Sequence, residues 1–143
     1  MREMKSGLTI HGHLLLAAVL LLTTGWLAAA DDETRVETVH FAKGASSKTI
    51  TGTIKGWQAV EYHLGASAGQ TMAVTLKSSN SANYFNVTAP GTETALFTGA
   101  DRGNHYSGSL PKDGTYKVLV FLMRNEARRG ESADYSISFS ITE

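Results

Sequence analysis

The sequence predicts an all-β protein, a two-layer antiparallel β-sandwich of about eight or nine short strands. Beyond residue 35, apolar residues alternate with polar ones instead of recurring at helical spacing. The alternating stretches are separated by clusters of Gly, Asn, Asp and Ser, which are typical of turns. No stretch carries a convincing helical pattern, so packed strands must provide the core.

The N-terminal segment differs in character from the rest of the chain. Arg2 and Lys5 precede a nine-residue apolar run over Leu14–Leu22, and Ala28–Ala30 offers small residues for cleavage. A basic start, a short apolar run and small residues, in that order, are typical of a secretory signal peptide. The run is shorter than the roughly 20 residues that a membrane span needs. We therefore expect residues 1–30 to be a signal peptide cleaved after Ala30, and residues 31–143 to be a single exported domain without a stable membrane anchor.

The composition excludes several classes of protein. The 143 residues include 13 Lys and Arg against 13 Asp and Glu, and no Cys. A balanced charge gives no support for nucleic-acid binding, which needs a surplus of basic residues. The absence of Cys excludes disulfides, thiolate catalysis and zinc sites with Cys ligands. An exported domain without disulfides suits the periplasm, and its stability must come from a packed core.

Three strands are expected in the first half of the domain. Ile50, Gly52 and Ile54 share one face of the first strand. The next two strands carry the alternating sets Val60, Tyr62, Leu64 and Met72, Val74, Leu76. The segment from Gly65 to Gln70 between them predicts a hairpin loop.

The second half contains the clearest strand patterns. Weaker alternation over Tyr84–Val87, Ala95–Phe97 and Tyr106–Leu110 predicts three short strands. After a turn at Lys112–Gly114, residues 116–123 are apolar on both faces, which predicts a strand covered on both sides. In residues 135–142, apolar residues alternate strictly with Ser and Thr, which predicts one buried and one wet face.

Residues that could support catalysis or bind a metal are scattered. The histidines His40, His63 and His105 lie in separate strand-like stretches without metal-ligand spacing. A site assembled from distant strands stays open, although an isolated strand histidine is usually structural. The pair Ser46-Ser47 has no neighbouring base, and Asp31–Glu33 lies at the expected new N-terminus, where carboxylates are usually solvated. The sequence therefore argues against an enzyme and indicates neither a metal nor a cofactor.

The first candidate for binding is the segment Arg124–Ser132, which joins the two clearest strands. It carries three arginines within six positions, a concentrated set of planar donors suited to carboxylates. If its middle residues form a turn of helix, Arg124 and Arg128 project to the same side. The alternative is a solvated hairpin loop whose arginines pair with Glu126 and Glu131.

The second candidate is the loop Lys55–Gln58, which contains Trp57 after a glycine turn. A tryptophan in this place is either a lid over the edge of the core or an exposed recognition aromatic, and the sequence leaves both open. Together the two loops indicate binding rather than turnover.

Segments spread over nearly the whole expected domain match one family, in the same order. They are Val39–Ser47, Gly52–Gly56, Gly69–Gln70, Tyr84–Phe85, Ser109–Tyr116, Arg124–Arg129 and Tyr135–Ile141. These segments resemble the periplasmic inhibitors of goose-type (g-type) lysozyme. The most specific of them is the pattern Arg-Asn-x-Ala-Arg in its place between the last two strands.

The resemblance implies a small β-sandwich that pushes loops into the substrate cleft of a g-type lysozyme and blocks it, in bacterial defence or in control of the cell's own lytic enzymes. The family positions that engage the enzyme fall on Trp57, Arg124 and Arg128. Supporting or rim positions are expected at Lys55, Asn125 and Arg129.

The chain also departs from the family pattern. The usual Tyr after Lys-Gly is Trp57 here, which keeps an aromatic plane, loses the phenolic hydroxyl and adds bulk. The segment from Thr88 to Gly103 matches poorly. Three other functions stay open: a periplasmic glycan-binding module that stacks Trp57 and Tyr84 on peptidoglycan sugars, a structural domain that docks to an envelope partner, and, more distantly, a hydrolase.

Overall fold

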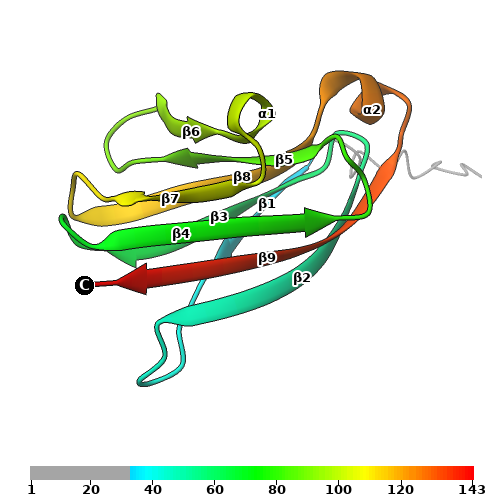
Figure 1. Cartoon of the computed structure of the whole chain (residues 1–143). Coiled ribbons are helices and arrows are strands. Elements are labelled where there is room, and N and C mark those ends of the chain that lie inside the picture. Colours follow the sequence, from blue (N-terminus) through cyan, green and yellow to red (C-terminus); the bar gives the residue numbers. More distant parts are fainter. Residues whose placement is uncertain (1–32) are drawn as a thin grey trace, which may run out of the picture.

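The computed structural model describes residues 33–143, so the expected signal peptide lies outside the described residues. This part of the chain folds into two packed sheets with two short helices (Figure 1). The five-stranded sheet consists, in spatial order, of β1 (Thr34–Thr38), β3 (Ala59–Ala66), β8 (Gly114–Leu122), β5 (Asn83–Thr88) and β6 (Ala95–Thr98). The four-stranded sheet consists of β2 (Ser47–Lys55), β9 (Ser132–Thr142), β4 (Thr71–Ser78) and β7 (His105–Ser109). The helices are α1 (Gly99–Arg102) and α2 (Arg124–Arg128). The predicted β-sandwich is confirmed.

One strand pair departs from the expected antiparallel arrangement. The edge strand β1 runs parallel to β3, with Thr34 opposite Ala59 and Thr38 opposite His63. The sequence did not predict β1, because its apolar residue Val36 is 56% exposed and no apolar alternation marks the segment. Backbone pairing with β3, rather than burial of its own side chains, holds this strand in place.

The inward-facing residues of both sheets form one core. The predicted alternation on β3, β4 and β9 is confirmed, since its apolar members are buried except Ile141, which is partly buried. The strand β8 lies in the middle of its sheet, as its two apolar faces suggested. Its inner residues are buried, whereas Leu119 and Phe121 on the outer face are only half-buried.

A pair of tyrosines joins the two sheets across this core. The hydroxyl groups of Tyr62 on β3 and Tyr135 on β9 form a buried hydrogen bond of 2.7 Å. Burial raises the pKa of both phenols above the usual value. The ring of Tyr135 lies over Gly52 on β2, where an added Cβ would come within 2.5 Å of the phenolic oxygen. Glycine at position 52 therefore makes room for the tyrosine pair.

The loop over Gly65–Gln70 is not a hairpin, contrary to the expectation from sequence. It connects β3 to β4, which belong to different sheets, so the chain crosses from one layer to the other. Each of these strands pairs with partners distant in sequence: β3 with β1 and β8, β4 with β7 and β9. Turn residues mark where a strand ends, but tertiary packing decides which strand becomes its neighbour.

Among the described residues, no helix has the length and apolar character to cross a membrane.

Candidate functional site

Three connections between the sheets meet at one end of the sandwich (Figure 1). They are residues 56–58 between β2 and β3, residues 79–82 between β4 and β5, and residues 123–131 between β8 and β9. We call this region the three-loop end. The strand register requires this meeting, because Lys55 lies opposite Ser132 and Asn83 lies opposite Leu122.

Backbone hydrogen bonds tie the three loops to one another and to the strands. Gly56 N–H donates to the carbonyl of Glu131 at 2.8 Å, which joins the first loop to the third. Met123 N–H donates to the carbonyl of Ala82 at 3.0 Å, which joins the third loop to the second. The three-loop end is thus one connected surface rather than three independent loops.

Trp57 is exposed at the tip of its loop. Gly56 has a φ of 60°, in the left-handed region that favours glycine, and this reverses the chain. The turn is closed by Gln58, whose N–H donates to the carbonyl of Lys55 at 3.1 Å. Trp57 is 48% exposed, so it is not a lid over the core.

The helix α2 presents two arginines to solvent. Ala127 is buried and anchors the helix against the core, and its N–H donates to the carbonyl of Met123 at 2.9 Å. Arg124 and Arg128 are exposed four residues apart, a spacing that puts them on one side of the helix, as the sequence suggested. Within residues 33–143, neither side chain makes an ion pair or a hydrogen bond.

Arg129 behaves differently from its two neighbours. Its Nε donates to Glu131 Oε2 at 2.8 Å, and its Nη2 lies 3.3 Å from Glu126 Oε1. The hydrogen bonds to Glu131 raise the pKa of the Arg129 guanidinium, which stays charged. Of the three arginines, only Arg129 pairs with acids among the described residues, so the alternative of acid-paired arginines describes Arg129 alone. The segment is also not a hairpin loop, because β8 and β9 belong to different sheets.

A cleft lies between residues 56–58, which we call the tryptophan loop, and helix α2, which we call the arginine helix. It has a volume of about 220 Å³ and is lined by Lys55, Gly56, Trp57, Ala127, Arg128 and Gly130. The structure thus places Trp57 beside Arg128, with Lys55 at the same cleft. Arg124 and the exposed Asn125 belong to the same helix but do not line it.

Two further residues of the three-loop end were not singled out from the sequence. Met123 is 37% exposed immediately before Arg124, although its apolar character placed it with the buried pattern of β8. The only sequence signal for its exposure is its position at the end of that pattern, next to charged residues. Asn80 donates through Nδ2 to Glu131 Oε1 at 3.3 Å and to the carbonyl of Ser132 at 3.2 Å. No sequence pattern brings Asn80 to Glu131, because only the fold makes them neighbours.

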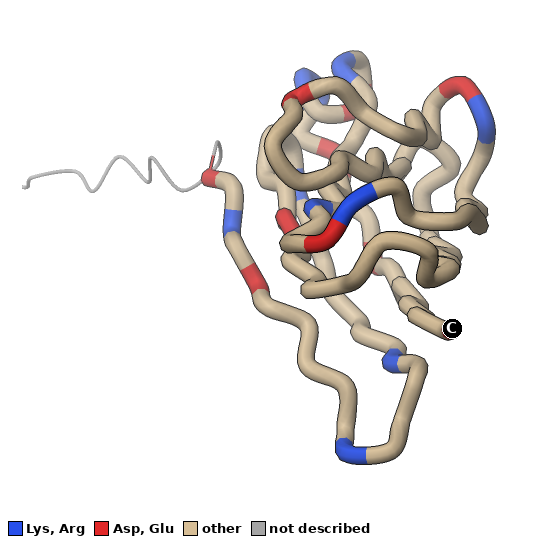
Figure 2. Tube along the Cα trace, turned by 90° about the vertical axis from the view of Figure 1, so that its left-hand side faces the viewer, with Lys and Arg blue, Asp and Glu red and all other residues tan. Residues whose placement is uncertain are grey.

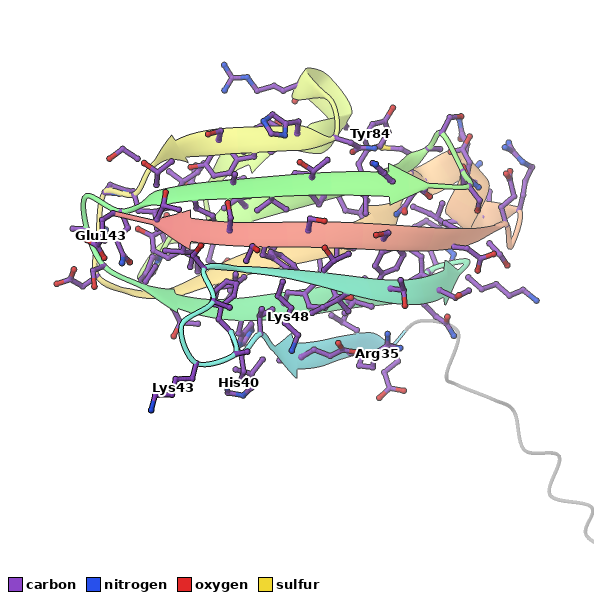
Figure 3. All side chains as sticks on the ribbon, turned by 60° about the horizontal axis from the view of Figure 1, so that its bottom comes forward. Arg35, His40, Lys43, Lys48, Tyr84 and Glu143 are labelled. Carbon is purple, nitrogen blue, oxygen red and sulfur yellow. The ribbon has the colours of Figure 1, made fainter. Side chains whose placement is uncertain are left out.

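The histidines have separate local partners. His63 Nε2 lies 2.6 Å from Glu61 Oε1 on β3, and His105 Nδ1 lies 2.8 Å from the Thr75 hydroxyl. His40 is exposed on the loop before β2, far from the three-loop end (Figure 3). No group of three or more His, Cys, Asp or Glu side chains within residues 33–143 is arranged to hold a metal ion.

Comparison with known proteins identifies the family. No protein-family model matches the chain. The inhibitor of g-type lysozyme from Escherichia coli strain K12 is 31% identical over 129 residues, which cover 87% of this chain and 93% of the relative. Among solved structures, Aeromonas hydrophila PliG, a periplasmic inhibitor of g-type lysozyme, is 40% identical with a TM-score of 0.72, over 78% of this chain and 99% of its own. Salmonella Typhimurium PliG is 29% identical with a TM-score of 0.60, over 76% and 98% of the two chains.

These relatives are inhibitors of an enzyme and not enzymes themselves. Their coverage extends over nearly all of each relative, so the likeness concerns the whole domain and not one motif. The chain described here belongs to the family of periplasmic inhibitors of g-type lysozyme.

Proposed function

We propose that the protein inhibits a g-type lysozyme by placing its three-loop end in the substrate cleft, with Arg124, Arg128 and Trp57 as the main contacts. The observation that carries this proposal is that the three arginines of the loop differ in their ion-pair partners. Arg129 is held by two carboxylates, whereas Arg124 and Arg128 are exposed with no acid partner among the described residues. Two guanidinium groups are therefore free to pair with another molecule without first breaking an internal ion pair.

The chemistry of the expected target matches this arrangement. Glycoside hydrolases act through carboxylic side chains in a sugar-binding groove. A guanidinium forms short charge-assisted hydrogen bonds to a carboxylate, and these gain strength where water is expelled. The Trp57 indole beside Arg128 offers a flat apolar surface of the kind that stacks in a sugar subsite.

The distribution of charge also favours recognition by a few placed residues. Basic and acidic residues are interspersed along the backbone trace (Figure 2), and the whole sequence has a formal net charge of zero. With no net charge, the molecule has no overall electrostatic attraction to every acidic surface. Specific binding then depends on the positions of Arg124 and Arg128 more than on overall attraction.

Rigidity of the three-loop end supports the proposal energetically. Ordering a mobile loop during binding costs roughly 0.5 to 1.5 kcal/mol for each immobilised side chain. The bonds from Gly56 to Glu131 and from Met123 to Ala82 already fix the loop backbones in the free protein. More of the interaction energy is then available for affinity.

A lysis assay tests the proposed function. Bacterial cells are treated with a g-type or a chicken-type lysozyme, with and without residues 31–143 of the protein. We expect protection against the g-type enzyme and none against the chicken-type enzyme. Binding to purified peptidoglycan without any protection would instead support a glycan-binding module and overturn the proposal.

Variants connect the activity to the three-loop end. Arg124→Ala and Arg128→Ala are compared with Lys43→Ala, which removes an exposed cation from the loop before β2 (Figure 3). That loop lies at the opposite end of the sandwich, because β2 begins at Ser47 opposite Ser140 near the end of β9. Loss of protection with the arginine variants but not with Lys43→Ala would connect inhibition to this end.

A further inference from the structure

Glu131 lies at the junction of all three loops. Its carbonyl accepts the Gly56 N–H at 2.8 Å, and its own N–H donates to the carbonyl of Glu126 at 3.0 Å. Its carboxylate is shared between two partners: Oε1 accepts from Asn80 Nδ2 at 3.3 Å, and Oε2 accepts from Arg129 Nε at 2.8 Å. One residue therefore connects the tryptophan loop, the loop over residues 79–82 and the arginine helix.

We propose that Glu131 is a positioning residue for inhibition: it fixes Arg128 and Trp57 relative to each other without being a main contact of the enzyme. This inference rests on the proposed function. Both carboxylate oxygens already have partners inside the protein, so a direct contact with lysozyme would have to compete with them. A negative charge facing an acidic cleft would also be repelled.

The position of Arg129 depends on the same carboxylate. Two guanidinium nitrogens of Arg129 donate hydrogen bonds to the Glu131 carboxylate, whereas one donates to Glu126, at 3.3 Å. Without the Glu131 charge, Glu126 is the only anionic partner of Arg129 among the described residues, and Arg129 becomes a more mobile cation next to Arg128. Arg129 lies between Arg128 and Gly130, which line the cleft beside Trp57. The bond from Arg129 to Glu131 connects this segment to Asn80, which donates to the other oxygen of the same carboxylate.

Charge and positioning predict opposite effects for one substitution. Glu131→Gln removes a negative charge from a surface that meets an acidic cleft, so charge alone predicts unchanged or stronger inhibition. Loss of the charge-assisted bond to Arg129 loosens the junction, so positioning predicts weaker inhibition. The sign of the change separates the two explanations.

The experiment compares Glu131→Gln with Glu93→Gln, which makes the same charge change on the exposed loop between β5 and β6. That loop lies at the opposite end of the sandwich, because β5 ends with Thr88 opposite Lys117 near the start of β8. We expect Glu131→Gln to weaken inhibition by about tenfold, the loss of one charge-assisted bond, and Glu93→Gln to leave it unchanged. Inhibition by Glu131→Gln as strong as that of the unmodified protein would overturn the proposal.

A second measurement follows the loop directly and needs no enzyme. Trp57 is the only tryptophan in residues 31–143, so its fluorescence reports on this one site. We expect Glu131→Gln to lower the fluorescence anisotropy of Trp57 and to make it more accessible to a neutral quencher such as acrylamide. Asn80→Ala, which removes the other carboxylate partner without changing charge, should move both quantities in the same direction by a smaller amount.

These readouts distinguish the failure of the positioning role from that of the proposed function. If the unmodified protein does not protect against g-type lysozyme, the proposed function is wrong, and the role in inhibition fails with it, whatever the fluorescence shows. If the protein inhibits but Trp57 anisotropy, quenching and inhibition are the same in Glu131→Gln, then only the positioning role is wrong.

Discussion

Gly56 and Glu131 are joined by a backbone hydrogen bond of 2.8 Å, although one follows β2 and the other precedes β9. The adjacent strands bring them together, since the last residue of β2, Lys55, lies opposite the first residue of β9, Ser132. The tryptophan loop and the arginine helix therefore share one base and keep a fixed relation to each other. The proposed binding surface therefore rests on the stiff sheet beneath it.

Truncation of either free arginine should abolish most of the inhibition. An alanine in place of a central arginine anchor commonly costs about 2 to 4 kcal/mol of binding free energy, or roughly 30-fold to 1000-fold in affinity. The melting temperature should stay nearly constant, because Arg124 and Arg128 are exposed and make no ion pair among the described residues. Inhibition assays and thermal melts of Arg124→Ala and Arg128→Ala test both parts. Unchanged inhibition by both variants would contradict the proposed contacts.

Replacement of Trp57 should distinguish stacking from simple bulk. Trp57→Ala should weaken inhibition by at least tenfold, because it removes an aromatic side chain that is 48% exposed and available for contact. Trp57→Tyr should retain most of the inhibition, since tyrosine keeps the plane. The comparison uses inhibition constants for the same g-type lysozyme. Equal losses for Tyr and Ala would show that the indole itself, and not aromatic stacking, is required.

The buried tyrosine pair should show strong coupling between its two hydroxyl groups. Tyr135→Phe leaves the Tyr62 hydroxyl without its partner at 2.7 Å, which should lower the free energy of unfolding by about 1 to 3 kcal/mol. The double variant with phenylalanine at both positions removes both polar groups and should be less destabilised than the sum of the single variants. Urea unfolding of the four proteins measures the coupling. Additive effects would mean that the hydrogen bond contributes little.

The same pair should make the protein sensitive to alkaline pH. Burial raises the pKa of Tyr62 and of Tyr135, so the folded protein keeps phenolic protons that the unfolded chain releases near its ordinary value of about 10. Below that pH both states are protonated and the pair adds no pH dependence. Above it the unfolded state binds fewer protons, so the free energy of unfolding falls as the pH rises.

Unfolding experiments between roughly pH 9 and 11 should therefore show a steeper decline for the unmodified protein than for the double phenylalanine variant. Parallel declines of the two proteins would place the alkaline sensitivity elsewhere.

Export should remove the N-terminal segment. We expect the protein recovered from the periplasm to begin at Asp31, because small residues precede that position after the apolar run. Intact-mass measurement of the periplasmic product identifies the cleavage site. A full-length mass in the membrane fraction would instead indicate that the segment is kept as an anchor.

The sequence predicted most of the sandwich. Strands with strict alternation, such as β9, were predicted because burial of one face leaves a period of two in the chain. The strand β1 was missed, because backbone pairing with β3 leaves no such pattern. The turn residues between β3 and β4 predict a hairpin, which is wrong, because turn chemistry does not encode the sheet to which the next strand belongs.

For the candidate site, local sequence was enough to select the two loops but not to arrange them. The spacing of Arg124 and Arg128 suggested a common side, as α2 provides. Which arginine pairs with acids could not be predicted, since Arg129 reaches Glu131 and Glu126 only through the shape of the loop. The link from Asn80 to Glu131 depends on strands that are far apart along the chain.

The parallel strand β1 determines how this protein should be handled. Glu33, just before it, accepts a hydrogen bond from the Ala59 N–H at 3.3 Å, so the polypeptide enters the domain beside the tryptophan loop. The last strand, β9, begins at the three-loop end and runs away from it, so Glu143 lies at the opposite end of the molecule (Figure 1). An affinity tag, fluorophore or sensor-chip linkage fused in front of residue 33 would crowd the surface that we propose for recognition. The same attachment after Glu143 would leave that surface facing outward, which makes the C-terminus the place for immobilisation.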